Sequence, residues 1–93
     1  MIEWHGDSPL IAFWHEGATT HLDVRPLLES GGEPYREIMS CVQQISAEDR
    51  LIVHAIFQPK PLIRQLERQG FLLAVEHVGP DHWTLDIAAA PPT

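Results

Sequence analysis

Residues 51–57 read LIVHAIF, a run in which His54 is the one polar residue. A strand that is apolar on both faces is typical of the centre of a sheet. Ile52 and Ile56 point away from the other apolar positions of the run, which indicates a sheet that is covered on both sides. The breaker sequence QPKP follows directly at 58–61. This stretch therefore predicts a central strand, to which the other elements must be fitted.

The segments before this strand predict a first strand and a first helix. Residues 20–26, THLDVRP, alternate polar and apolar side chains as far as Pro26, which is the pattern of a strand. Apolar residues then recur every three or four positions from Pro34, which predicts a helix that begins at Pro34 with Glu33 at its cap. The alternative start, a capping box of Ser30 and Glu33, would place Pro34 where its missing N–H costs a helical hydrogen bond.

The segments after the central strand predict a second helix and a hairpin. Residues 61–70 begin with Pro61 and end with Gly70, an arrangement typical of a helix. Two strands at 71–78 and 82–88 then flank a turn. The order β-α-β-α-β-β predicts an α/β (α+β) two-layer sandwich, in which a four-stranded mixed sheet carries two helices on one face.

The chain divides into three parts. Residues 20–88 form the sandwich, and residues 89–93, AAPPT, are expected to be a disordered tail. Residues 1–19 form an apolar extension that includes one extra strand, LIAFW, at 10–14. Because an exposed segment this apolar would be prone to aggregation, we expect it to cover the open face of the sheet or to pack on a partner subunit, as in a homodimer.

Composition limits the classes of function. A chain of 93 residues that is 44% hydrophobic and 20% charged is typical of one small globular domain. The single cysteine excludes an intramolecular disulfide, and with no signal-like N-terminus it predicts a cytoplasmic protein. No apolar run approaches the roughly 18 residues of a membrane span. A net charge of −7 makes nucleic acid an unfavourable partner.

Three stretches together resemble a known family. They are LDVRPLLESGGEPYREIM (22–39), LIVHAIFQPKPLIRQLERQGF (51–71) and HWTLDI (82–87). In order and spacing they are similar to the cysteine-less, uncharacterised branch of the TusA-like or SirA-like sulfur carriers. The resemblance covers roughly residues 20–87 and implies the sandwich described above. Relatives in that branch are often attached to hemerythrin-like or other redox-associated domains, which implies redox-linked or metal-linked partners.

The resemblance also implies that the sulfur chemistry is missing. In the sulfur carriers a Cys-Pro-x-Pro motif opens the first helix, where the helix N-terminus stabilises the thiolate that carries a persulfide. That motif falls on residues 31–34, where the second proline is kept as Pro34 and the cysteine is replaced by Gly31. Cys41 lies on the apolar stripe of the predicted helix, so we expect it to be a buried core residue and not a substitute.

Even without a thiol, the predicted helix starts at Pro34 and at Pro61 remain candidate binding sites. Glycines at 31 and 32 allow a ligand to approach the backbone, and Arg25 could add a cation beside them. Glu33 and Glu37 would repel an anion, so a simply capped helix is the competing interpretation. The candidate ligand-binding residues are Arg25, Gly31, Gly32, Glu33, Pro34, His54, Lys60 and Pro61.

Six histidines make a metal site the other candidate. None of them forms a helical ligand pair, but His77 and His82 flank a turn that contains Asp81, and these three could hold a transition metal such as zinc, copper or iron. Depending on strand order, His54 could also join His21 or an N-terminal histidine.

No catalytic constellation is present in the sequence, so an enzyme is the least supported class. Two classes of function stay open. One is a non-catalytic binding or interaction module for a protein partner or a small ligand, and the other is a histidine-based metal-binding or carrier protein.

Overall fold

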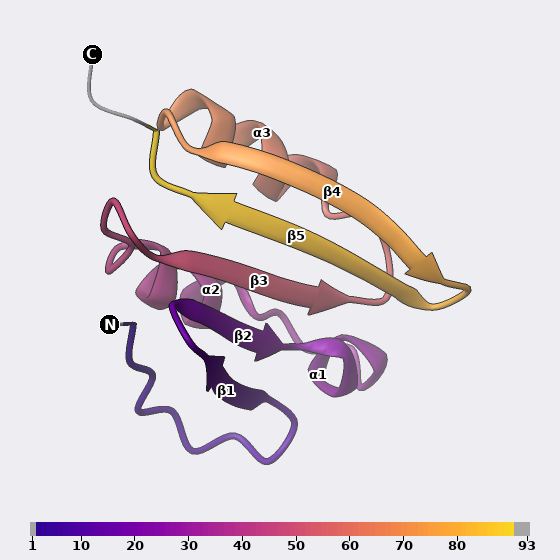
Figure 1. Cartoon of the computed structure of the whole chain (residues 1–93). Helices are drawn as coiled ribbons and strands as arrows, with labels where there is room; N and C mark the ends of the chain where they lie inside the picture. The colour runs from indigo at the N-terminus through magenta and orange to yellow at the C-terminus, as the bar shows by residue number, and fades with distance from the viewer. Residues whose placement is uncertain (1, 91–93) are drawn as a thin grey trace.

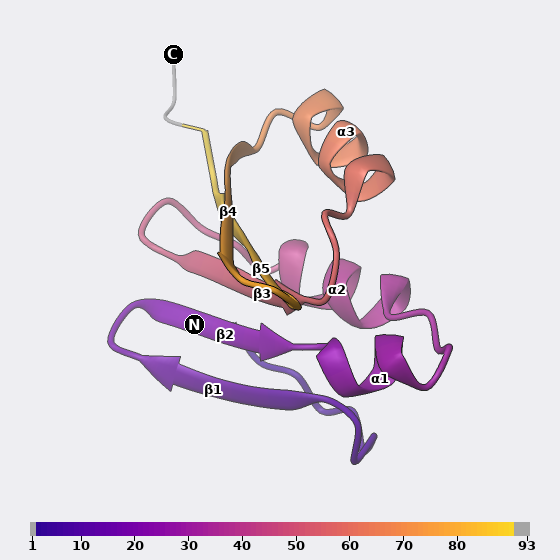
Figure 2. The same cartoon turned by 90° about the vertical axis from the view of Figure 1, so that its right-hand side faces the viewer.

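A computed structural model describes residues 2–90 of the chain. It contains five strands in the order β1-β2-β3-β5-β4, with three helices on one side of the sheet (Figures 1 and 2). Strands β2 and β3 are parallel, and the other neighbours are antiparallel. The elements are β1 Ala12–Glu16, β2 Thr19–Asp23, α1 Arg25–Glu29, α2 Tyr35–Val42, β3 Arg50–Ala55, α3 Lys60–Arg68, β4 Leu72–Gly79 and β5 His82–Ala88.

The predicted central strand is confirmed as β3, which lies between β2 and β5. Leu51, Val53 and Ala55 are buried on the face that the helices cover. Ile52 and His54 lie on the opposite face, which we call the open face, and are only partly buried. The expected two-layer α/β architecture is therefore present: the predicted N-terminal strand joins the four predicted strands in one sheet, and there is one more helix than the sequence predicted.

The additional strand, β1, pairs antiparallel with β2 through a turn at Gly17, whose φ is +61°. It starts two residues later than the predicted strand at 10–14. The segment before it packs on the helix side: Ile2 is 0% exposed, Ile11 is 8% exposed, and both belong to the main core. The Glu3 N–H also donates to Oε1 of Gln44, just beyond α2, at 2.8 Å. This segment thus completes the helix-side core. The prediction of a sheet covered on both sides is wrong for the described residues, because Ile52 on the open face stays partly exposed.

The additional helix, α1, lies between β2 and α2, where the sequence predicted no helix. At its end Gly31 N–H donates to Leu28 O at 3.0 Å and Gly32 N–H donates to Leu27 O at 2.9 Å. This pair of bonds is the Schellman motif, which requires a left-handed residue at the position of Gly31, and φ there is +87°. Five residues are too few to show helical periodicity, which is why the pattern did not reveal α1.

The predicted helix at Pro34 begins one residue later, as α2, with Pro34 as its cap. The carboxylate of Glu33 accepts a hydrogen bond from Tyr35 N–H at 3.0 Å, so it satisfies one of the free N–H groups of the first turn. The predicted second helix is confirmed as α3. Its end repeats the Schellman motif at Gly70, where φ is +91°.

The core lies between the sheet and the helices and contains Ile2, Ile11, Leu22, Val24, Ile38, Cys41, Val42, Leu51, Val53, Leu66, Leu85 and Ile87. Among residues 2–90, no helix is long and apolar enough to cross a membrane. Of the tail expected at 89–93, residues 91–93 lie outside the described residues.

Candidate functional site

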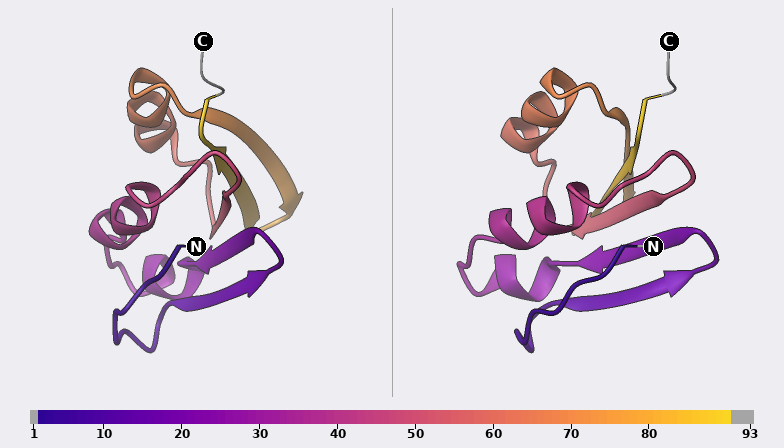
Figure 3. Two further views of the ribbon diagram at one scale, coloured as in Figure 1. Left: turned by 60° about the vertical axis from the view of Figure 1, so that its left-hand side comes forward. Right: turned by 90° about the vertical axis from the view of Figure 1, so that its left-hand side faces the viewer.

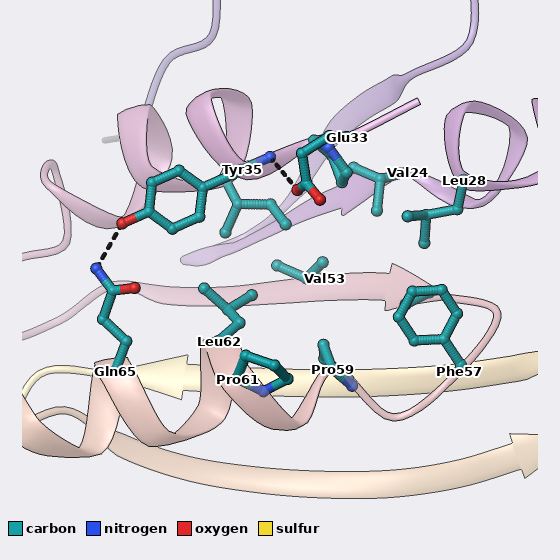
Figure 4. A pocket seen from close by; sticks show the side chains of 13 residues that line it. Val24, Leu28, Glu33, Tyr35, Val53, Phe57, Pro59, Pro61, Leu62 and Gln65 are labelled. Atoms are coloured by element: carbon teal, nitrogen blue, oxygen red, sulfur yellow. Dashed lines mark hydrogen bonds between the residues drawn. The ribbon is translucent and has the colours of Figure 1, made fainter. Parts of the chain in front are cut away.

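A cavity with a volume of about 530 Å³ lies between α2 and α3, above the centre of the sheet (Figure 4). Its floor comes from small or β-branched side chains: Val24 after β2, and Val53 and Ala55 on β3. Ile38 on α2 and Leu62 on α3 form facing walls. Because these floor side chains are short, they do not fill the space between the two helices.

The arrangement of the helices leaves this space open. Both helices pack on the same side of the sheet, α2 over its β2–β3 part and α3 over its β4 part (Figure 3). The loop between β3 and α3 contributes Phe57 and Pro59 to the lining, and Pro61 adds to it from the first turn of α3. The prolines restrict the backbone of this loop, and Phe57 remains 50% exposed beside the cavity.

The polar groups of the cavity lie at its rim. Glu33 and Tyr35 come from the start of α2, and Gln65 comes from α3. The amide of Gln65 donates a hydrogen bond to the hydroxyl of Tyr35, which links α2 to α3 at one end (Figure 4). The carboxylate of Glu33 is exposed and is held by Tyr35 N–H. The cavity thus combines an apolar interior with one negative charge and two neutral polar groups.

Three of the predicted ligand-binding residues, Glu33, Pro34 and Pro61, line this cavity. Periodicity did not indicate Tyr35 or Gln65. The one available sequence signal for this cavity was Phe57 together with Pro59 before α3 and Pro61 in its first turn. The other predicted residues do not line the cavity. They are Arg25, Gly31, Gly32, His54 and Lys60.

The predicted residues that do not line the cavity have other contacts. Gly31 and its neighbour use their N–H groups to end α1, so this stretch is a helix C-terminus and not the anion-binding N-terminus that was expected. Arg25 is occupied by Asp23: its Nη2 lies 2.8 Å from Oδ2 and its Nε lies 3.0 Å from Oδ1. Burial alone would raise the pKa of Asp23, but the hydrogen bonds from Arg25 outweigh it and lower that pKa. Lys60 begins α3 at an exposed position, and His54 lies on the open face.

The open face brings three histidines together. Nδ1 of His21 lies 2.9 Å from Nε2 of His54, and Nδ1 of His54 lies 2.8 Å from Nε2 of His82. The indole ring of Trp14 stacks on His21 with ring centroids 4.8 Å apart and on His54 with centroids 5.5 Å apart. We call His21, His54 and His82 the histidine row. The sequence predicted that His54 joins His21 or an N-terminal histidine, depending on strand order, and did not include His82 in that group.

Residues 21–89 match the family described as an uncharacterized conserved protein, DUF2249. The chain belongs to the DUF2249 family. No curated protein and no solved structure matches it. The DUF2249 region includes every residue that lines the cavity and all three members of the histidine row. It leaves out β1, and therefore Trp14.

The metal cluster predicted from the turn of the DUF2249 hairpin does not form. His77 stacks on Trp83 with ring centroids 4.1 Å apart, whereas His82 contacts His54 on the open face. Trp83 and His82 are successive residues of β5, so their side chains point to opposite faces of the sheet. His77 stacks on Trp83 and therefore lies on the face opposite His82. They cannot converge with Asp81. Among the described residues, no group of three or more His, Cys, Asp or Glu side chains is placed to hold a metal ion.

Cys41 of the DUF2249 chain is confirmed as a core residue. Its side chain is 0% exposed, and burial raises the pKa of its thiol to about 11. A thiolate is the reactive form of cysteine, so this position cannot take over sulfur chemistry at neutral pH.

Proposed function

We propose that this DUF2249 chain is a non-catalytic binding module whose cavity between α2 and α3 receives the apolar part of a small ligand. The observation that carries the proposal is the cavity itself. Its volume of about 530 Å³ falls in the range of small-molecule sites, and its interior is apolar with a few polar groups at the rim, as such sites are.

The charges of the molecule favour one class of ligand. Glu33 is the charged residue of the cavity lining, and the net charge of the whole chain is −7. Both repel an anion and attract a cation or a hydrogen-bond donor. The ligand proposed is therefore neutral or cationic, with an aromatic or branched apolar body in the cavity and a donor group at Glu33.

The lining of the cavity favours binding over catalysis. It contains no His, Cys, Ser, Thr or Lys, so it offers no nucleophile with an adjacent base. The tyrosine hydroxyl and the amide at the rim bind each other. Such groups suit recognition of a ligand more than transfer of a proton to it.

The relation to the TusA-like sulfur carriers belongs to the same proposal. It is supported by the quoted motifs and by the β-α-β-α-β-β order that β2, α2, β3, α3, β4 and β5 reproduce. Redox-linked or metal-linked partners and a cytoplasmic location are expectations from that resemblance and from the single cysteine. The alternative of histidine-based metal binding has less support, because His54 directs its two nitrogens to different neighbours and one ion could reach only one of these pairs.

Binding of a neutral fluorescent probe, N-phenyl-1-naphthylamine, tests the proposal. We expect its emission to rise on binding and to saturate at one probe per chain. The Ala55→Leu variant fills the floor of the cavity and should weaken binding by about tenfold or more, which corresponds to a loss of about 1.4 kcal/mol. Ala12→Leu makes the same change on an exposed strand and should leave binding unchanged.

Glu33→Gln separates the apolar part of the site from its charge. It should leave the affinity for the neutral probe unchanged and should weaken binding of an amphiphilic amine such as phenylpropylamine. Circular dichroism of each variant shows whether its fold is intact. Equal binding by the wild type and by folded Ala55→Leu would overturn the proposal.

A further inference from the structure

The histidine row crosses three adjacent strands on the face opposite the cavity. His21 lies on β2, His54 on the neighbouring β3, and His82 at the start of β5, which pairs with β3 on its other side (Figure 1). Their rings form one continuous line through the two contacts of 2.9 Å and 2.8 Å. Nothing in the proposed function of the cavity uses this row.

Counting protons shows what the row can hold. Three imidazoles carry six ring nitrogens, and each of the two hydrogen bonds holds one proton between two of them. With both bonds intact, the row therefore holds at most four protons, two in the bonds and two on the outer nitrogens. Three neutral imidazoles already carry three of these, so the row accepts one more proton without losing a bond. A further proton would place two N–H groups against each other and would therefore break one of the two hydrogen bonds of the row.

One end of the row has an anionic and an aromatic neighbour. Nε2 of His21 lies 3.5 Å from a carboxylate oxygen of Glu16, and the Trp14 ring stacks on His21 with only 2° between the ring planes. A carboxylate and an aromatic face both stabilise a cation. The geometry thus places a carboxylate and an aromatic face at the His21 end of the row, while His54 and His82 share the hydrogen bond at the other end.

The surroundings of His54 oppose a positive charge on its ring. Burial is the largest cause that lowers the pKa of His54 to about 4; the nearby Asp23 carboxylate works against it, while His21 and His82 add to the lowering. Asp23 is itself paired with Arg25 through both of its oxygens. Among the described residues, this face also carries Glu76 on β4, which pairs with Thr84, the partner of His54 on β5. The ion pair of Arg50 and Asp86 lies further along β3 and β5.

We propose that His21, His54 and His82 form a single-proton site that makes the open face of this protein pH-responsive. The row takes up one proton with both of its hydrogen bonds intact. Uptake of a second proton breaks the row and releases the stack with Trp14, which loosens β1 at the edge of the sheet. Between about pH 6.5 and pH 4 the folded chain binds fewer protons than the unfolded chain, because the pKa of His54 is lowered to about 4. The contribution of His54 to the free energy of unfolding is therefore fully present above about pH 6.5 and is lost as the pH falls toward about 4.

Nuclear magnetic resonance of ¹⁵N-histidine-labelled protein, titrated from about pH 8 to about pH 5, tests the proposal. We expect the three rings of the row to take up about one proton in total, with all three sets of signals changing together. His5, whose side chain is 86% exposed, serves as an independent reference in the same sample.

Shortening the row gives the sharpest contrast. In His82→Gln the pair His21–His54 should still take up about one proton, whereas three independent histidines would lose one proton of uptake. In His54→Gln the outer histidines are separated, and uptake should rise to about two protons. His77→Gln on the other face is the matched control and should change nothing in the row.

Two results would overturn the proposal. One is independent titration of the three rings in the wild type, with uptake that falls by one proton in His82→Gln. The other is one tightly held Zn²⁺ per chain that removes the titration, since the row would then be a metal site. If His54→Gln does not fold, as judged by circular dichroism, His82→Gln and the wild type alone decide between these outcomes.

Discussion

Cys41 shows how position decides reactivity at the scale of a residue. It lies on the face of α2 that packs on the sheet, next to Val42 and one turn after Ile38, and all three side chains are buried. Apolar surroundings disfavour the thiolate, which is why the pKa of the thiol rises to about 11. The same spacing of three and four residues that predicted the helix also predicted this burial.

Alkylation with iodoacetamide checks the burial of Cys41. At about pH 7.5 we expect the native protein to remain unmodified over hours, because the thiolate fraction is very small and the side chain is inaccessible. Protein unfolded in guanidinium chloride should react completely, as measured by mass spectrometry, and serves as the control. Rapid modification of the folded protein would show that Cys41 is accessible.

At the scale of elements, α1 gives the glycine pair that follows it, Gly31 and Gly32, a structural role at its C-terminus. The family resemblance places the missing cysteine at Gly31, where a helix was expected to open. The structure shows that Gly31 closes α1, with a φ of +87° that side-chain-bearing residues rarely adopt. The glycine therefore has a structural role of its own, independent of any lost chemistry.

Returning a cysteine to this position should destabilise the protein. We expect Gly31→Cys to lower the free energy of unfolding by about 1–2 kcal/mol, because the left-handed conformation is unfavourable for a residue with a Cβ. No atom lies within 4 Å of the Cβ that would be added, so steric clash does not contribute. Gly31→Asn should cost less, since asparagine tolerates this conformation. Urea unfolding measures both, and an equal loss for the two variants would argue against backbone strain as the cause.

At the scale of the whole molecule, the N-terminal segment is part of the fold. The DUF2249 match begins at residue 21, yet Ile2 and Ile11 are buried against side chains of α2 and the sheet. We expected the apolar extension to cover the open face of the sheet or to pack on a partner subunit, whereas these two residues are buried in the helix-side core of their own chain. A homodimer through this segment stays a prediction.

Ile2→Ala tests how much this segment contributes. We expect it to lower the free energy of unfolding by about 2–4 kcal/mol, as large-to-small changes in a core do, whereas Leu10→Ala at a more exposed position should change it by less than about 0.5 kcal/mol. Chemical denaturation gives both values. If Ile2→Ala instead split a dimer in native mass spectrometry and left the stability of the chain unchanged, the segment would be an interface.

Local patterns were sufficient to predict several parts of this protein. The double-sided apolar run gave β3, the apolar stripe gave α2 and the burial of Cys41, and Pro61 and Gly70 bounded α3. These features depend on residues close in sequence, whose periodicity and backbone preferences act locally. The same reasoning missed α1, because so short a helix has no periodicity to detect.

The candidate sites depend on contacts between residues far apart in the chain. The row exists because the sheet order places β3 between β2 and β5, which brings His21, His54 and His82 together across 33 and 28 residues of sequence. The cavity exists because α2 and α3 cover different parts of the same sheet, with Val53 and Ala55 too small to fill the space between them. Strand order and the separation of packed helices leave no periodic signal in a sequence, because they arise from how the finished elements pack against one another.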